Sequence, residues 1–343
     1  MADVNGAGDG QSAVGETLPE PAPLGPVGPP AGAEDLDVAG RGVRLRATRW
    51  AGEGAGARGT VLLLHGLASQ RRFWNLVAPR VAAAGYDVVA LDQRGHGDAE
   101  RPPAGPYDVT TCADDAVAAL DGLGVRKAVV VGHSWGAWVA LTVAARHPER
   151  VQAVLAVDGG TATPGGGGPR EEVRKRLEPP RFALPPEELA AMLARGALGP
   201  WWSPQLEAAL LPGFGVGADG LARARLRFDL HLQVLDGLLD AGMDDVLPAV
   251  VAPAWVVSCE PLPVPHGATD PSYPDESWRR AREEGLERAA RLLPRARILR
   301  WAGALHDVPL QWPALVAGTV LAAADEALSE PGTVVDPTTG GAG

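Results

Sequence analysis

The chain has 343 residues, of which 46% are hydrophobic, and this is enough for one large core or for a core with a smaller cap. Its formal net charge of −11 argues against a nucleic-acid partner and against binding to an anionic membrane surface. The two cysteines, Cys112 and Cys259, are isolated and lack metal-ligand spacing, so we expect neither a disulfide framework nor a metal or cofactor.

The sequence carries no signal for export or for membrane insertion. No apolar run is long enough to span a bilayer, and the N-terminus lacks a basic stretch followed by an apolar one. We therefore expect a cytoplasmic protein. Nothing in the sequence indicates its oligomeric state.

In chain order, residues 1–35 are Gly, Pro, Ala and acidic residues without periodicity, and we expect them to be disordered, as we do residues 331–343. Folded structure should begin near Val43 with an edge strand at 43–47. Helices are expected at 71–84, at 111–123 and after Ser134, and they alternate with buried strands at 60–64, 87–91, 129–131 and 151–157. This alternation predicts a parallel sheet with right-handed crossovers.

The alternation stops after residue 160. Residues 161–247 show helical patterns interrupted by Gly and Pro, including an arginine-rich helix around 221–239, and no convincing strand. A segment of this length is too long for a loop, so we predict a helical insertion. The core would then comprise residues 36–160 and 248–330, with further strands at 254–258 and 297–301.

Gly132-His133-Ser134-Trp135-Gly136 fits the nucleophile-elbow pattern G-x-S-x-G. It lies between a clear strand and a clear helix, which is the context that the motif requires. Glycines at 132 and 136 permit the close backbone approach of a sharp strand-to-helix turn. Ser134 should lie at its apex in a strained conformation, with its hydroxyl near the free amides of the helix N-terminus. The pattern predicts a nucleophilic serine.

Together with the elbow, three further motifs make the chain resemble the α/β-hydrolase family, in its branch with a serine nucleophile and a cap. They are the turn at His65-Gly66, the turn at 94–97, and His306 between the last strand and the last helix. The resemblance covers residues 43 to about 327. It implies an eight-stranded, mostly parallel sheet flanked by helices, with the 161–247 insertion as a helical cap after the sixth strand.

The resemblance also implies roles for individual residues. His306 would be the general base for Ser134, since histidine titrates near neutrality. The backbone amides of Leu67 and Trp135 would form the oxyanion hole. The histidines at 65, 96 and 133 are expected to be structural.

The acid of the triad stays open. Most family members carry an Asp in the loop after the strand that corresponds to 254–258, where this chain has Pro261 or Leu262. The candidates are Asp158, at the end of the sixth strand where some members place their acid, and Glu260. The further alternatives are Asp270, if the Pro-rich loop folds back, and a site without an acid.

The pocket should lie between the cap and the carboxyl edge of the sheet. Candidate substrate contacts are Trp74, Trp201, Trp202 and Phe214, of which only some are expected to face the pocket, since most could equally belong to the core of the cap. Arginines 223, 225 and 227 are interpreted as solvated charge. The predicted function is hydrolysis of a small hydrophobic ester, thioester or lactone. Alternatives are a C–C bond hydrolase, an acyltransferase, or a degenerate homologue that only binds a ligand. The serine argues against the epoxide hydrolases and haloalkane dehalogenases of this family, which use Asp.

Overall fold

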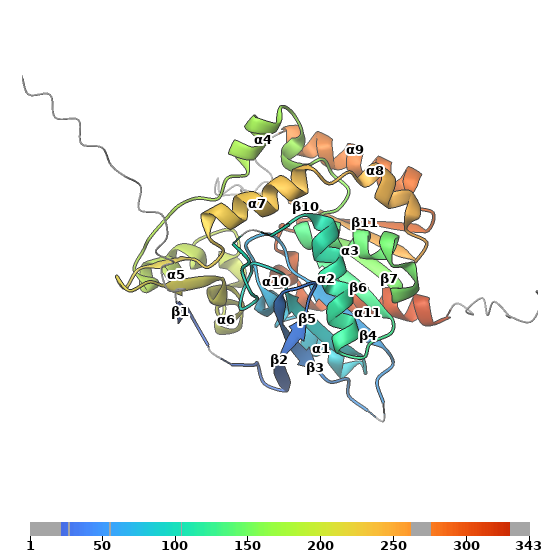
Figure 1. The fold of residues 1–343 in the computed structure, drawn as a ribbon, viewed down its shortest axis with the longest axis horizontal. Coiled ribbons are helices and arrows are strands. Elements are labelled where there is room, and N and C mark those ends of the chain that lie inside the picture. Colours follow the sequence, from blue (N-terminus) through green and yellow to red (C-terminus); the bar gives the residue numbers. More distant parts are fainter. Residues whose placement is uncertain (1–21, 27, 55, 104, 262–275, 330–343) are drawn as a thin grey trace, which may run out of the picture.

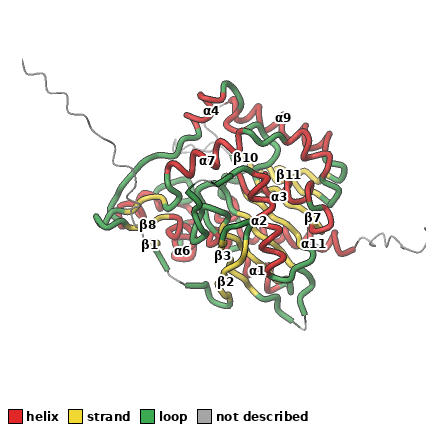
Figure 2. Tube along the Cα trace, in the orientation of Figure 1, coloured by secondary structure: helices red, strands yellow, loops and turns green. Residues whose placement is uncertain are grey.

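A central sheet of eight strands, in the order β11-β10-β7-β6-β4-β5-β3-β2, has helices on both of its faces (Figures 1 and 2). The computed structural model describes residues 22–329 except 27, 55, 104 and 262–275. No helix in these ranges is both long and apolar enough to cross a bilayer.

The strands of the structure are β1 (Ala22–Pro23), β2 (Ala33–Ala39), β3 (Arg44–Trp50), β4 (Thr60–Leu64), β5 (Asp87–Asp92), β6 (Ala128–His133), β7 (Val151–Val157), β8 (Phe214–Val216), β9 (Ala222–Ala224), β10 (Ala254–Glu260) and β11 (Ala296–Ala302). The α-helices are α1 (Ala78–Ala83), α2 (Val109–Gly122), α3 (Trp135–Arg146), α4 (Arg170–Arg176), α5 (Pro186–Ala194), α6 (Pro204–Leu210), α7 (Phe228–Leu239), α8 (Met243–Val246), α9 (Glu276–Leu292), α10 (Val308–Gln311) and α11 (Pro313–Ser329).

The predicted architecture is confirmed. The five pairings among β11, β10, β7, β6, β4 and β5 are parallel. Only the pairs β5–β3 and β3–β2, at one edge, are antiparallel. All parallel strands therefore end at the same edge of the sheet, and the loops that leave that edge are brought together.

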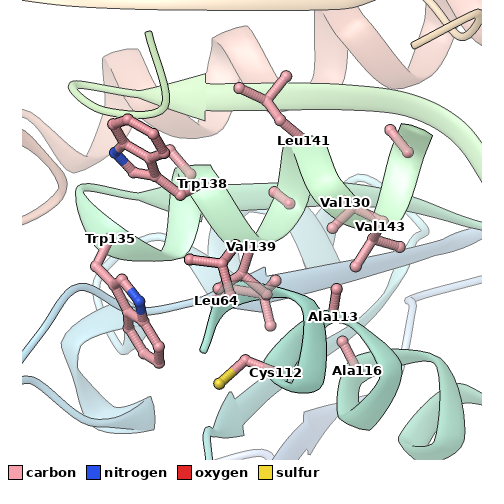
Figure 3. Close-up of a cluster of buried hydrophobic side chains, with 14 of the residues drawn as sticks. Leu64, Cys112, Ala113, Ala116, Val130, Trp135, Trp138, Val139, Leu141 and Val143 are labelled. Carbon is pink, nitrogen blue, oxygen red and sulfur yellow. The ribbon is translucent and has the colours of Figure 1, made fainter. Parts of the chain in front are cut away.

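Each central strand contributes to two cores because successive side chains point to opposite faces. Along β4, Leu62 and Leu64 belong to one buried cluster, and Val61 and Leu63 belong to the other. The first cluster is closed by α2 and α3, and Figure 3 shows that the small side chains of Ala113 and Ala116 on α2 lie on the side of that helix that faces α3. Burial on both faces explains why these strands read as continuous apolar runs.

The N-terminal boundary predicted from the sequence is wrong in part. Residues 22–35, expected to be disordered, contain β1 and the start of β2. β2 pairs antiparallel with β3 and forms the true edge of the sheet, so the strand expected at 43–47 is the second one. The predictions for residues 1–21 and 331–343 lie outside the described residues.

The insertion at 161–247 contains helices such as α4 and α5, as its helical patterns predict, but it is not entirely helical. β8 and β9 pair with each other, and β1 pairs with β8, to form a small antiparallel sheet. The arginine-rich helix expected around 221–239 begins only with α7 at Phe228. Arginines at 223 and 225 recur with a spacing of two, which is the period of a strand.

The interpretation of Arg225 as solvated charge is also wrong. Its side chain is 8% exposed, and its Nη2 lies 2.8 Å from Oδ1 of Asp98. Asp98 follows β5 in the core, so this ion pair ties the cap to the core. Arg223, in contrast, forms an exposed pair with Asp219 within the cap.

The Arg225–Asp98 pair belongs to a larger buried network. Asp98 Oδ2 lies 2.7 Å from Nη1 of Arg71, which also pairs with Asp92 and Asp35. Although burial raises the pKa of Asp98, the attraction of Arg71 and Arg225 outweighs it and lowers the pKa to about 2. Asp98 therefore stays ionised in the folded protein across the physiological range.

We predict a measurable coupling between Asp98 and Arg225 in a double-mutant cycle of Asp98→Asn and Arg225→Met, read by urea unfolding at pH 7. The expected coupling is about 1–2 kcal/mol, less than for a fully buried pair, because Asp98 is 40% exposed. Since the folded-state pKa of Asp98 is lowered, its contribution is present above the unfolded value of 3.8 and is lost as the pH falls through about 2. The matched control is the exposed Arg223–Asp219 pair, whose coupling should be smaller. Equal coupling energies in the two pairs would contradict the conclusion that the Arg225–Asp98 ion pair holds the cap on the core.

Candidate active site

Ser134 occupies a sharp turn between β6 and α3, with φ 53° and ψ −121°. A non-glycine residue at positive φ is strained, and here the surroundings hold it in place. A Cβ on Gly132 would lie 2.0 Å from the Gly136 carbonyl oxygen, and one on Gly136 would lie 2.5 Å from the Leu64 carbonyl oxygen. The two glycines of the motif are thus required by the contact of the turn with itself and with β4.

Two further glycines lie against Ser134, one in each of the loops that follow β4 and β7, the strands on either side of β6. A Cβ on Gly66, in the loop after β4, would be 3.0 Å from the Ser134 Cβ. A Cβ on Gly159, after β7, would be 2.2 Å from the Ser134 carbonyl oxygen. The Ser134 amide donates a hydrogen bond of 2.9 Å to the Val157 carbonyl. The position of the serine is therefore set by the loops after β4 and β7 as well as by its own motif.

Asp158 and His306 form a direct hydrogen bond. His306 Nδ1 lies 2.6 Å from Asp158 Oδ2, and the Asp158 side chain is 6% exposed. The other carboxylate oxygen, Oδ1, accepts a hydrogen bond of 2.9 Å from the Cys259 amide. Asp158 itself has φ 50°, and its amide donates to Val257. Two strands, β7 and β10, thus orient this carboxylate toward the histidine.

The other acid left open by the sequence is directed elsewhere. Glu260 Oε1 lies 2.9 Å from Nη1 of Arg300, which also pairs with Glu283. Asp270 lies outside the described residues. Of the two described candidates, the structure brings Asp158 and not Glu260 to His306. Sequence alone left this open because the bond joins residues that are 148 positions apart.

The two amides expected to form an oxyanion hole are close to the serine. Trp135 is the first residue of α3, directly after Ser134, and Leu67 follows Gly66. Within the described ranges, neither of these N–H groups donates to a protein acceptor. Both residues line the same cavity as Ser134, His306 and Asp158.

The remaining histidines near the site are buried and support its loops. His65 Nδ1 hydrogen-bonds the Gly66 carbonyl, its Nε2 accepts from the Gln93 amide, and burial lowers its pKa to about 4. Burial also lowers the pKa of His96, whose ring stacks on Trp135. His133 donates from Nε2 to the carbonyl oxygen of His306 at 2.8 Å, and burial together with the His306 charge lowers its pKa. These three rings are therefore neutral at pH 7. His306 is the histidine that both bonds Asp158 and lines the cavity.

The cavity beside Ser134 has a volume of about 310 Å³ and is mostly apolar. Trp138 of α3, Leu235 and Leu238 of α7, and Leu286 of α9 provide much of its wall, so the cap covers the site. None of these four residues was predicted as a substrate contact from the sequence. Helical spacing offered a signal, since Trp138 lies one turn beyond Ser134 on α3.

The four aromatic residues predicted to contact substrate do not line this cavity, and this part of the prediction is wrong. Trp74 is fully buried in the cluster on the other face of the sheet, and Trp202 packs against that cluster. Trp201 is 37% exposed, and Phe214 starts β8 and contacts Phe182. Trp74 and Trp202 contribute instead to the packing on the other face of the sheet, and Trp201 reaches the surface.

We expect Gly159→Ala to destabilise the protein by about 3 kcal/mol and to slow labelling of Ser134 by a fluorophosphonate, because the added Cβ would overlap the Ser134 backbone. Urea unfolding and probe labelling measure the two effects. Gly242→Ala is the control, since a Cβ there meets nothing within 4 Å. Equal stability of the two variants would contradict the packing described for the elbow.

Asp158→Asn should slow fluorophosphonate labelling of Ser134 by about 10³-fold or more, because the histidine loses the carboxylate that fixes its tautomer and stabilises its cation. Glu260→Gln should leave the labelling rate within about twofold. Labelling is followed by mass spectrometry at matched protein concentration. A larger loss in Glu260→Gln than in Asp158→Asn would exclude Asp158 as the acid.

Comparison with known proteins agrees with the fold. Residues 59–194 match the family model described as alpha/beta hydrolase fold. Epoxide hydrolase A of Mycobacterium tuberculosis is 42% identical over 117 residues, which are 34% of this chain and 35% of that protein. An epoxide hydrolase of Caballeronia sordidicola is 33% identical over 145 residues, 42% of this chain and 43% of that protein. The matches thus span less than half the length of these curated relatives.

Among solved structures, that of E-2-(acetamidomethylene)succinate hydrolase superimposes with a TM-score of 0.66 at 22% identity, covering 85% of this chain and 99% of the other. At this identity the likeness concerns the fold alone. The eight-stranded sheet, the elbow between β6 and α3, and the match of residues 59–194 to the family model show that this chain has the α/β-hydrolase fold.

Proposed function

We propose that this protein is a serine hydrolase that cleaves a small carboxylic ester, thioester or lactone through an acyl-enzyme. The observation that carries the proposal is the 2.6 Å bond between His306 Nδ1 and Asp158 Oδ2 on the cavity that Ser134 also lines. A carboxylate on Nδ1 fixes the tautomer in which Nε2 is the basic nitrogen. His306 can then take a proton from a serine hydroxyl that by itself is a weak nucleophile.

Acylation follows from this arrangement. Ser134 Oγ attacks the carbonyl carbon of the substrate while its proton passes to His306, and Asp158 stabilises the resulting imidazolium. The carbonyl oxygen becomes an oxyanion that accepts hydrogen bonds from the amides of Leu67 and Trp135. The proton on His306 then goes to the leaving alcohol or thiol, and the acyl group stays on Ser134.

Deacylation repeats the steps with water as the nucleophile. His306 takes a proton from water, and the same two amides stabilise the second oxyanion. When this intermediate collapses, His306 returns the proton to Ser134 Oγ and the carboxylic acid is released. If an alcohol, amine or thiol replaced water in this step, the same site would be an acyltransferase. Adding an alcohol, amine or thiol to the ester assay described below, and measuring the acylated acceptor beside the free acid, separates these two outcomes.

The similarity to epoxide hydrolases does not extend to this chemistry. Attack of a carboxylate on an epoxide gives an ester, which water can hydrolyse at its carbonyl. Attack of Ser134 on an epoxide would give an alkyl ether, which has no carbonyl and would block the enzyme. A serine at the elbow is therefore suited to acyl substrates, in which both the substrate and the intermediate contain a carbonyl.

The cavity supports a small substrate with apolar parts. Its volume of about 310 Å³ falls at the lower end of the range usual for ligand sites, and leucines and tryptophans dominate its wall. We propose that the apolar part of the acyl or alcohol group lies against Trp138, Leu235 and Leu238.

The test is hydrolysis of p-nitrophenyl esters from acetate to octanoate. We expect turnover by the wild type and a loss in kcat of about 10⁴-fold or more in Ser134→Ala and His306→Ala, because the triad acts as a unit. Glu260→Gln, outside the triad, is the matched control and should retain activity. A wild-type protein that neither hydrolyses any chain length nor reacts with a fluorophosphonate would favour a ligand-binding homologue without turnover.

A further inference from the structure

The wall of the cavity contains hydrogen-bonding atoms that the described protein leaves unsatisfied. His231 Nε2, Ser258 Oγ and Trp135 Nε1 are buried without a hydrogen-bond partner among the described residues, and all three residues line the cavity beside Ser134. Buried polar atoms are almost always paired, so exceptions on a ligand cavity point to groups that pair with the ligand.

His231 is the member of this set that the cap supplies. It lies on α7, one turn before Leu235 and two turns before Leu238, and all three side chains line the cavity. The apolar stripe of α7 over the site is thus interrupted by one polar residue, which is 7% exposed. A leucine would satisfy the packing of this position better than an unpaired imidazole.

The surroundings of His231 indicate which of its two ring nitrogens carries the proton. The backbone carbonyl of Leu177 lies close enough to the ring to raise its pKa, and Nε2 is the ring nitrogen that is buried without a partner among the described residues. Burial lowers the pKa of His231 to about 4, so the ring is neutral at pH 7. With its proton on the nitrogen that faces the Leu177 carbonyl, Nε2 carries a lone pair and acts as an acceptor. The group that it recognises must therefore be a donor.

The charges on the cavity narrow the identity of this donor. Arg176 and Arg282 also contribute to the wall, and their guanidinium groups donate to the carbonyl oxygens of Gly165 and Cys259. Two cations disfavour an ammonium group on the ligand. An anionic group would in turn be repelled by the lone pair of Nε2. A neutral hydroxyl or amide N–H fits both constraints.

Resting on the proposed function, we infer that the substrate is an ester or lactone that carries a hydroxyl or amide N–H away from the scissile bond, and that His231 Nε2 accepts a hydrogen bond from it. Ser258 of β10 lines the same cavity, and its hydroxyl can hydrogen-bond a polar group of the substrate as donor or acceptor. His231 is in this view a specificity residue. A site built to pair with a polar group discriminates strongly against the analogue that lacks it.

The experiment compares matched esters with and without a terminal hydroxyl. On the acyl side the pair is p-nitrophenyl 6-hydroxyhexanoate and p-nitrophenyl hexanoate; on the alcohol side it is 4-hydroxybutyl hexanoate and butyl hexanoate. For one of the pairs we expect the wild type to prefer the hydroxylated ester by about tenfold in kcat/KM. In His231→Leu this preference should fall to about one or reverse, while His231→Gln, which keeps an acceptor, should retain part of it.

The ratio of two kcat/KM values on one enzyme preparation does not depend on the fraction of folded protein, so partial misfolding of His231→Leu would not imitate the result. Leu235→Val, one turn away on the same face, is the matched control and should change both esters alike. A wild-type ratio near one for both pairs, or a ratio that His231→Leu leaves unchanged, would overturn the inference while Ser134-dependent hydrolysis would still support the proposed function.

Binding to Ser134→Ala, measured by calorimetry with the same esters, reads the inference without turnover. The hydroxylated ester should bind about tenfold more tightly, and the added substitution His231→Leu should remove the difference. If the wild type hydrolyses nothing, the proposed function fails, and this binding ratio still decides whether His231 selects a donor. Equal binding of the two esters would overturn the inference.

Discussion

The contact of backbone with backbone around Ser134 is the constraint on which the rest of the structure depends. The turn is closed so tightly that glycines on β6, on α3 and in the loops after β4 and β7 all approach within the space that a methyl group would occupy. Ser134 is held at positive φ by these neighbours and not by its own preference. The fixed register of the sheet brings these four segments together. The position of Ser134 is therefore set by the pairing of the strands.

The loop after β7 has a double role in this arrangement. Gly159 packs against the serine, and the residue before it, Asp158, bonds the histidine. The strands that precede Ser134 and Asp158, β6 and β7, are direct neighbours in the sheet, with His133 in register with Val157. Adjacent strands therefore fix the serine and Asp158 relative to each other, whereas His306 comes from a distant segment of the chain. His133 holds that segment by its bond to the His306 carbonyl.

The sheet and the elbow could be predicted from the sequence because both depend on local pattern. The run 151–157 was predicted at its true bounds, and Gly132 to Gly136 can be recognised without any tertiary information. Local pattern could not decide whether Asp158 or Glu260 contacts His306. That choice depends on which side chain the fold brings to each carboxylate, and these are His306 for Asp158 and Arg300 for Glu260. The cap was predicted least well. Its strands β8 and β9 have three residues each, which is too short for periodicity to be visible, and its aromatic residues pack into cores that the sequence does not reveal.

The buried ion network has a consequence for how this chain can change. Three arginines, Arg71, Arg72 and Arg225, face three carboxylates, Asp35, Asp92 and Asp98, so the cluster is balanced in charge. Its members come from the N-terminal segment, the core and the cap. A single substitution leaves an odd buried charge, whereas a compensated pair does not. Sequence variation at these six positions should therefore be correlated, and a cap without a cation opposite Asp98 should dock less tightly on this core.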